Sequence, residues 1–194
     1  MSNQNDKEIE IQVRVEYIKP LIKFLNEKAS FISQVHQIDK YYIPNHRNFL
    51  KTKPIEEWLR LRDSSGKLSI NYKKVHYDKI GKTLYRDEYE SSIGEIPALE
   101  KIFKAIDIKE IVVVDKTRKI YSYNDYEISL DNIKGLGDFV EVEYKGNDKD
   151  ALPDNINCDM VNFLKEMGCG KITINYMGYP YQILFPKETR VEEV

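Results

Sequence analysis

Residues 8–13 read EIEIQV, an alternation of polar and apolar side chains that continues to residue 15. A period of two predicts a β-strand with one apolar and one polar face. Glu8, Glu10 and Gln12 share the polar face, so two carboxylates stand in line on one side of the strand. The alternation does not say which face points inward, and for a single strand a charged face in solvent is the ordinary arrangement. The other strands must decide the question.

Charge sorts by strand along the rest of the chain. Four predicted strands each carry two neighbouring charges of one sign on one face: Glu8 and Glu10, Glu141 and Glu143, Arg60 and Arg62, and Lys116 and Arg118. Because like charges at neighbouring positions repel, solvent-exposed sheets usually mix the signs. Faces of one sign are easier to explain if they converge on a common interior, with a cation against the acids and a polyanion against the bases. We therefore expect these faces to point inward.

Such an interior would suit a polyphosphate. Carboxylates are the preferred ligands of Mg²⁺ or Mn²⁺, ions that commonly bridge to phosphate oxygens. Arginine and lysine side chains donate to several phosphates at once. The alternative is a set of interior salt bridges without any metal, which would bury many charges at a large desolvation cost.

The whole chain sets further bounds. Its 194 residues favour a single domain spanning 1–194, and a net charge of -2 gives no general attraction to nucleic acid or to a membrane. Cys158 and Cys169 lack a metal-ligand spacing, and the polar N-terminus lacks the apolar segment of a signal peptide. We expect a cytoplasmic protein with reduced cysteines. No zinc-type histidine pair, glycine-rich phosphate loop or nucleophile elbow occurs in the sequence.

The pattern of elements favours an α+β fold. Apolar residues at helical spacing predict helices over 17–28, 94–108 and 157–168, and the tail over 178–188 is compatible with one short helix. Alternation and turn signals predict strands over 8–15, 37–44, 57–63, 67–74, 83–93, 110–123, 124–133 and 137–144. A few helices inserted between runs of strands are typical of helices covering a curved or closed antiparallel sheet.

These pieces together resemble the CYTH domain, or triphosphate tunnel metalloenzyme, family. The resemblance rests on EIEIQV at residue 8, FLKTKPIEEWLRLRD at 49, LSINYKK at 68, YRDEYE at 85 and DKTRKIYSYNDYEISLDNIKGLGDFVEVE at 115. It covers roughly residues 8–144, and the last piece is similar to the class IV adenylyl cyclase subset. The resemblance implies a closed antiparallel β-barrel, an eight-stranded tunnel with a charged interior.

The resemblance also implies roles for particular residues. It implies metal ligation by Glu8, Glu10, Glu141 and Glu143, and a part for Asp131 in positioning a metal or accepting a proton. We expect Tyr41 to orient the substrate or leaving group, and Trp58 to pack on the exterior. The residues expected to bind phosphate are Gln12, Arg60, Arg62, Lys73, Arg86, Lys116 and Arg118.

One position departs from the family pattern, which is Glu-x-Glu-x-Lys on the first strand. Gln12 stands where the family has the lysine, and it can donate a hydrogen bond to a phosphate but carries no charge.

Three functions follow as alternatives. The first is a class IV cyclase that converts ATP to cyclic AMP and pyrophosphate, and the second is a triphosphatase acting on a nucleoside triphosphate, thiamine triphosphate or tripolyphosphate. The third is a binding module without catalysis. Both enzymes would use Mg²⁺ or Mn²⁺, and we expect a monomer or homodimer.

Overall fold

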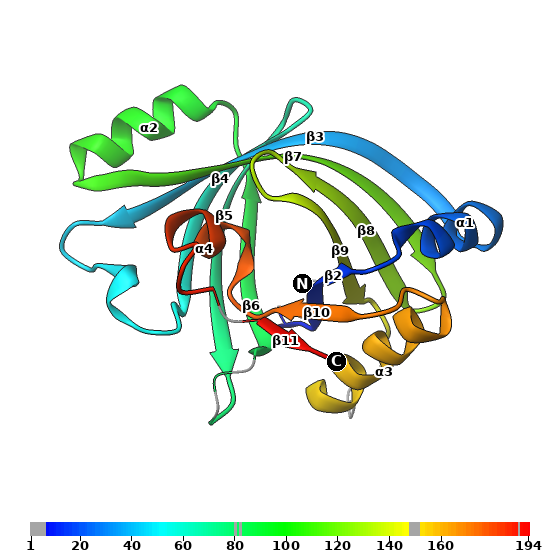
Figure 1. Cartoon of the computed structure of the whole chain (residues 1–194). Coiled ribbons are helices and arrows are strands. Elements are labelled where there is room, and N and C mark those ends of the chain that lie inside the picture. The colour runs from blue at the N-terminus through cyan, green and yellow to red at the C-terminus, as the bar shows by residue number, and fades with distance from the viewer. Residues whose placement is uncertain (1–6, 80, 82, 148–151, 190) are drawn as a thin grey trace.

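A computed structural model describes residues 7–79, 81, 83–147, 152–189 and 191–194. This part of the chain forms one antiparallel sheet of eleven strands, with four α-helices against it (Figure 1). The strands are β1 (Lys7–Glu8), β2 (Glu10–Val15), β3 (Ser30–Pro44), β4 (Glu57–Ser64), β5 (Lys67–Tyr77), β6 (Thr83–Ser92), β7 (Ile108–Tyr123), β8 (Tyr126–Ile133), β9 (Gly137–Tyr144), β10 (Ile172–Asn175) and β11 (Val191–Glu193). The helices are α1 (Ile18–Lys28), α2 (Ile96–Ala105), α3 (Pro153–Glu166) and α4 (Gly178–Leu184), with a 3₁₀ turn at Phe49–Lys51.

The first strand joins the two sides of the tunnel. The hydrogen-bonded order is β1-β6-β5-β4-β3-β7-β8-β9-β2-β10-β11. β1 pairs with β6 and β2 pairs with β9, and only Ile9 separates β1 from β2 in the chain. Residues 7–15 therefore act as one strand, which with β3 to β9 forms the predicted eight-stranded tunnel. Chain continuity at Ile9, rather than an unbroken ladder of hydrogen bonds, brings the two edges together.

Most predicted elements are present, but one strand is longer than predicted and two further strands were not predicted. The strand predicted over 37–44 is the end of the much longer β3, because β3 pairs with β7 from Ser30 onward. β10 and β11 were not predicted, and they extend the sheet beyond β2. The ambiguous tail contains α4, which packs against β7.

The apolar face of the tunnel wall is the outer one. Ile11 lies opposite Val142, and Val13 opposite Val140, in the pairing of β2 with β9. All four side chains are buried in a core that also contains residues of α1 and α3. Glu10 and its alternating neighbours must then point to the other side, into the tunnel. The predicted charged interior is confirmed.

Helices cover this outer face through narrow apolar stripes. Leu21 and Leu25, four residues apart on α1, are fully buried, and so are Met160 and Leu164 on α3. α3 ends near Gly168, whose φ of 74° is the left-handed conformation that glycine adopts without a steric penalty. α2 packs against β7 and places Phe103 in a smaller core (Figure 1).

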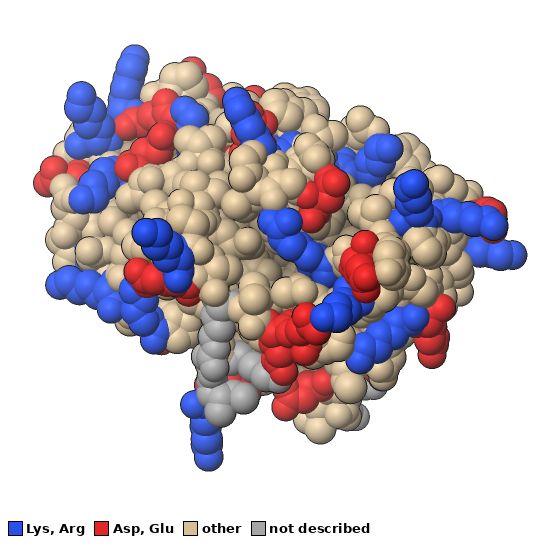
Figure 2. All heavy atoms as spheres, in the orientation of Figure 1, with Lys and Arg blue, Asp and Glu red and all other residues tan. Residues whose placement is uncertain are grey.

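The outer surface differs from the interior in how its charges are arranged. Figure 2 shows lysine and arginine side chains interspersed with acidic ones across one face of the molecule. This is the mixing expected of a solvated surface, and it contrasts with the single-sign faces inside. Across the described residues, no helix has the length and apolar character needed to cross a bilayer.

Candidate functional site

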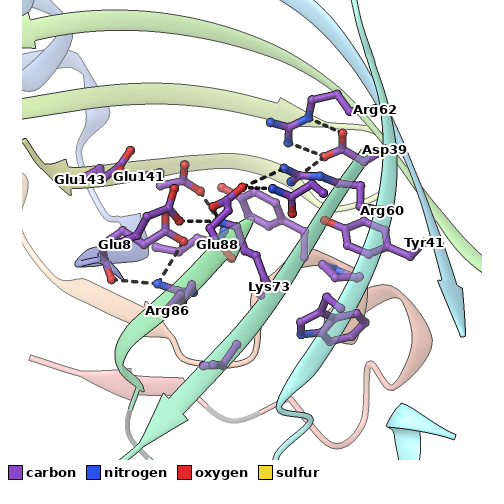
Figure 3. Close-up of a pocket in the computed structure, with 18 of the residues that line it drawn as sticks. Glu8, Asp39, Tyr41, Arg60, Arg62, Lys73, Arg86, Glu88, Glu141 and Glu143 are labelled. Carbon is purple, nitrogen blue, oxygen red and sulfur yellow. Dashed lines mark hydrogen bonds and ion pairs between the residues drawn. The ribbon is translucent and has the colours of Figure 1, made fainter. Parts of the chain in front are cut away.

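The tunnel encloses a cavity of about 280 Å³ whose wall is dominated by charged side chains. Among the described residues, six cations line it: Arg60, Arg62, Lys73, Arg86, Lys116 and Arg118. Eight carboxylates line it as well: Glu8, Glu10, Asp39, Glu88, Glu90, Glu127, Glu141 and Glu143. Figure 3 shows Glu8, Glu141 and Glu143 toward one side, Asp39, Arg60 and Arg62 toward the other, and Lys73 and Glu88 between them.

The arginine side of the cavity is built on β3 and β4. Arg62 donates from Nε and Nη2 to the two oxygens of Asp39, at 2.6 and 2.7 Å, and an Arg60 nitrogen lies 3.6 Å from the same carboxylate. Burial alone would raise the pKa of Asp39, but Arg60 and Arg62 outweigh it and hold the pKa well below its usual range. Arg60 Nε is buried and has no hydrogen-bond acceptor among the described residues, so an anionic ligand could supply one.

Lys73 links two carboxylates in the middle of the cavity. Its Nζ lies 2.8 Å from Glu8 and 2.6 Å from Glu88. Burial, with smaller contributions from Glu88 and Glu10, raises the pKa of Glu8 to about 8 even though Lys73 opposes the shift. For Glu88, Lys73 and Arg60 outweigh burial and hold the pKa well below its usual range. Glu8 is thus the carboxyl of this pair that holds a proton near neutral pH, as expected when two acids share a buried site.

The acidic side of the cavity is formed by β2 and β9. Glu10 lies opposite Glu143 in the pairing of these strands, and Gln12 lies opposite Glu141. Arg86 is 3.0 Å from a Glu10 oxygen, and Lys145 is 2.6 Å from Glu143. Burial and the nearby Glu10 raise the pKa of Glu143 to about 7, since Lys145 offsets them only in part.

Asp131 shares the tunnel-facing side of β8 with Glu127, but Arg118, Lys116 and Tyr179 lie between it and the cavity. Arg118 donates to both of its oxygens at 2.6 and 2.5 Å, Lys116 Nζ is 3.3 Å away, and the Tyr179 hydroxyl donates to it at 2.9 Å. Arg118 also lies 2.7 Å from Glu141. Through these contacts Asp131 positions Arg118 and Lys116, and its expected part in positioning a metal or accepting a proton stays a prediction. Burial and Arg118 lower the pKa of Lys116 to about 8.

Both polar atoms of the Gln12 side chain form hydrogen bonds. Its Nε2 donates to Glu141 at 3.2 Å, and its Oε1 accepts from Asn175 at 2.6 Å. Arg14, the next polar residue along β2, is exposed and donates to the backbone of Leu136 while covering the Phe139 ring. Arg14 is absent from the cavity wall, so it does not replace the lysine of the family pattern.

Tyr41 and Trp58 both line the cavity, with their rings edge to face at 5.6 Å. The expectation that Trp58 packs on the exterior was wrong. It alternates with Arg60 and Arg62 on β4 and so points to the same side of the strand. Tyr41 lies two residues from Asp39 on β3 and is in place to contact a ligand, although its role as a catalytic residue stays a prediction.

The carboxylates of the cavity suit an Mg²⁺ or Mn²⁺ ion that is bound partly by its substrate. Within the described residues, no three acidic, histidine or cysteine side chains lie in a ready-made metal site. Magnesium, however, usually binds through one or two carboxylates, several waters and substrate phosphates. Glu10 and Glu143, with Glu8 beside them, offer such hard oxygen donors on the acidic side of a cavity that is also lined by arginine and lysine side chains. The residues therefore fit a cation that binds together with its substrate.

Several residues of the site were not predicted, and four of them hold the predicted ones in place. Asp39 and Glu88 are central to the ion pairs, Asn71 donates to both Glu88 and Glu90, and Tyr179 holds Asp131. Glu88 could have been found, because it alternates with Arg86 on β6. Tyr179 could not, because its position depends on where the tail folds back onto β7.

Comparisons with known proteins agree with this geometry. The family model of the CYTH domain matches residues 6–171. A Methanocaldococcus jannaschii protein provisionally named adenylate cyclase is 33% identical over 173 residues, which are 89% of this chain and 95% of the relative. The solved structure of the PH1819 protein from Pyrococcus horikoshii is 27% identical with a TM-score of 0.74, covering 93% of this chain and 99% of that one.

A further solved structure shares the fold alone. It is a provisionally assigned adenylyl cyclase from Hippeastrum, 17% identical with a TM-score of 0.61, covering 92% of this chain and 95% of that one. The inward charges, the tunnel of eight strands and the match over residues 6–171 agree with one another. The chain belongs to the CYTH domain family.

Proposed function

We propose that this protein is a divalent-metal-dependent enzyme that acts on a triphosphate inside the tunnel, as an adenylate cyclase that converts ATP to cyclic AMP and pyrophosphate. The observation that carries the proposal is the convergence of six cations from β4, β5, β6 and β7 on one buried cavity. Burying so many charges is costly unless partners compensate them. A triphosphate with a bound cation would compensate both signs at once.

The cations of the cavity bind the phosphates, and two carboxylates hold these cations in position. Arg60 and Arg62 on one side, and Arg118 and Lys116 on another, donate to phosphate oxygens and hold the chain of phosphates extended along the cavity. Asp39 fixes the plane of the Arg62 guanidinium group through two hydrogen bonds, and Asp131 does the same for Arg118. Such preorganised donors stabilise the charge that develops on a leaving pyrophosphate.

The acidic side would hold the cation. Glu10 and Glu143 would be its protein ligands, with Glu8 and Glu141 close by. When bound there, Mg²⁺ or Mn²⁺ polarises phosphoryl oxygens and offsets their negative charge. Turnover by this chain therefore depends on deprotonated carboxylates at this side.

Two observations favour a cyclase over a less specific assignment as an enzyme that acts on triphosphates. The relative from Methanocaldococcus jannaschii carries the name of an adenylate cyclase, and it matches this chain over most of both lengths. The stretch from residue 115 to 143, which is similar to the class IV cyclases, supplies Lys116, Arg118 and Glu141 to the cavity.

Hydrolysis of a triphosphate is the second candidate, because the same cavity could admit water in place of a ribose hydroxyl as the nucleophile. The Hippeastrum protein of the same fold is described as having a dominant triphosphatase activity. The third candidate, binding without turnover, draws support from Gln12, whose amide is already engaged by Glu141 and Asn175.

One assay separates the three. The purified protein is incubated with ATP, thiamine triphosphate and tripolyphosphate in Mg²⁺ or Mn²⁺, and products are resolved by chromatography. Cyclic AMP with pyrophosphate supports the cyclase, whereas inorganic phosphate with a diphosphate supports the triphosphatase. Binding without any product supports the third candidate, and absence of binding by all three compounds would contradict the proposal.

A further inference from the structure

A second cavity lies beside the tunnel. It has a volume of about 360 Å³ and is lined by residues of β2, β6, β10 and α3. Its wall shares Glu10, Gln12 and Arg86 with the tunnel cavity, so the two spaces meet at these side chains. We call this second cavity the side chamber.

The side chamber exists because the tunnel wall has a gap at its seam. β6 pairs with residues 7 and 8 of the first strand, and β10 pairs with residues 13–15 of the same edge. Among the described residues, no strand pairs with residues 9–12 on that side, and α3 packs over the position. The Thr83 hydroxyl, at the start of β6, donates to the backbone carbonyl of Tyr176 just after β10. This contact bounds the gap on the side away from the first strand.

Arg86 spans the opening between the two spaces. Its Nη1 lies 3.0 Å from a Glu10 carboxylate oxygen and 3.4 Å from the Glu10 backbone carbonyl. The Arg86 side chain is buried, yet it lines both cavities. A phosphate that passes from the chamber into the tunnel would therefore meet a guanidinium group on the way.

The chamber wall has the chemistry of a site for an organic group. Ile11, Val161 and Ile174 supply apolar surface, in contrast to the charged tunnel. Asn157, on α3, has a buried Oδ1 with no hydrogen-bond partner in the described part of the chain. A buried acceptor without a partner is costly, and a ligand N–H would satisfy it. Apolar walls, a few convergent polar groups and a volume above about 300 Å³ are typical of small-molecule sites.

We propose that the side chamber binds the base of a nucleoside triphosphate, an aromatic ring with an N–H donor, while its phosphates pass Arg86 into the tunnel. This inference rests on the proposed function, because it takes the tunnel to be the phosphate site. It adds a substrate class: a nucleotide is preferred over inorganic tripolyphosphate, which has no group to fill the chamber.

The proposal also fixes the direction of the substrate. A base in the chamber places the α-phosphate beside Glu10 and Glu143, and the terminal phosphates toward Arg60 and Arg62. Attack at the α-phosphate next to the cation ligands, with pyrophosphate leaving among the arginines, is the orientation that a cyclase needs. A base at the Tyr41–Trp58 side would reverse it.

A cysteine in the side chamber allows the proposal to be tested by chemical labelling. Cys158 lines the chamber and is exposed, whereas Cys169 is fully buried, and burial raises the pKa of its thiol to about 11. N-ethylmaleimide should therefore label Cys158 selectively. Calorimetry with ATP and with tripolyphosphate, in Mg²⁺, compares labelled and unlabelled protein, with Cys158→Ser given the same treatment as the control.

The label should weaken ATP binding about tenfold and change tripolyphosphate binding less than about twofold. The treated Cys158→Ser protein should bind both compounds as the untreated variant does. A label that weakens both compounds equally, or neither, would overturn the proposal. If unlabelled protein binds neither ATP nor tripolyphosphate, the proposed function itself fails.

A second pair of variants tests the same proposal without a label, so that a distortion of α3 by the label cannot explain the result. Asn157→Leu should weaken ATP about two- to tenfold, the range for one lost hydrogen bond, and leave tripolyphosphate unchanged. Asn155→Leu, at an exposed position of α3 outside the chamber wall, should change neither. If Asn157→Leu has no effect on ATP and Trp58→Leu weakens it, the base lies at the other side of the tunnel and the proposal is wrong.

Discussion

Gln12 and Glu141 face each other across the pairing of β2 with β9, and the Gln12 amide donates to the Glu141 carboxylate at 3.2 Å. The other end of the amide accepts from Asn175, whose own oxygen accepts from the backbone of Met177 at the start of α4. A lysine at position 12 could donate to Glu141 but could not accept from Asn175. The departure from the family pattern thus links the tunnel wall to the tail.

Gln12→Lys should tighten tripolyphosphate binding about tenfold, because it adds a charge-assisted contact worth roughly 1.4 kcal/mol. It should also lower the free energy of unfolding by about 1–2 kcal/mol, since the buried Asn175 amide loses its acceptor. Calorimetry and urea denaturation measure the two effects. Gln12→Met, which has similar size and no charge, is the control and should not tighten binding. Equal affinities of the parent and Gln12→Lys would show that position 12 does not face the phosphates.

Glu10→Gln should raise the Mg²⁺ concentration for half-maximal turnover about tenfold or more, because it removes an anionic ligand and keeps the side-chain shape. Titration of activity with Mg²⁺ measures the change. Glu90→Gln is the matched control, because Glu90 lines the same cavity and is largely exposed near Arg60. Excess EDTA should abolish turnover of the parent. Turnover that persists in EDTA would exclude a catalytic metal.

Asp39→Asn should cost about 3 kcal/mol of unfolding free energy at pH 7, because it removes a buried carboxylate that pairs with both Arg62 and Arg60. The pKa of Asp39 is lower in the folded chain than in the unfolded one, so its stabilisation is complete above the unfolded value. The difference between parent and variant should therefore shrink as the pH falls below about 4.

Urea denaturation between pH 3 and pH 7 measures that difference. Asp115→Asn is the control: Asp115 pairs with the exposed His36 on the surface, and its loss should cost less than about 1 kcal/mol. A difference between parent and Asp39→Asn that stays constant down to pH 3 would contradict the assigned ion pair.

The inward direction of the charges could be predicted because its evidence is local. A period of two places the side chains of each strand on two faces, and neighbouring charges of one sign, such as Arg60 and Arg62, show that a face is unusual. The same alternation would have placed Trp58 inside, had it been applied to every residue of β4. The inward direction of the charges could therefore be predicted from short stretches, whereas the eight-stranded tunnel was implied by the resemblance to the CYTH family.

Pairing between distant segments could not be predicted in this way. That Glu8 shares Lys73 with Glu88 depends on β5 lying next to β6 and on the seam at β1. The pairing of Asp131 with Arg118, by contrast, follows from the two-residue turn between β7 and β8, which sets their register. A one-residue slip would move every side chain to the other face, and no local pattern specifies the register of strands joined by long connections. The seam at residues 9–12, and the chamber it opens, have no signature in the sequence.

Lys116 gives a prediction about protons. Burial and the neighbouring Arg118 lower its pKa to about 8 in the free protein, well below its usual value of about 10.5. Bound phosphates favour the charged form and should raise the pKa again. At a pH between the pKa of Lys116 in the free protein and its pKa in the complex, Lys116 is neutral when free and charged when bound. Binding must therefore take up a proton in this pH range, and affinity must fall as the pH rises above 8.

Calorimetry of tripolyphosphate binding at pH 9, in buffers of different ionisation enthalpy, should show uptake of most of one proton from Lys116, and a smaller value at pH 6.5, where Lys116 is already charged. Other groups of the cavity also titrate, so the result is the difference between the parent and Lys116→Met. Lys40→Met is the control, because Lys40 pairs with Glu100 away from the cavity wall, and it should keep the parent's proton uptake. If Lys116→Met takes up as many protons at pH 9 as the parent, the amine is not beside the phosphates, and the six cations do not act on one ligand.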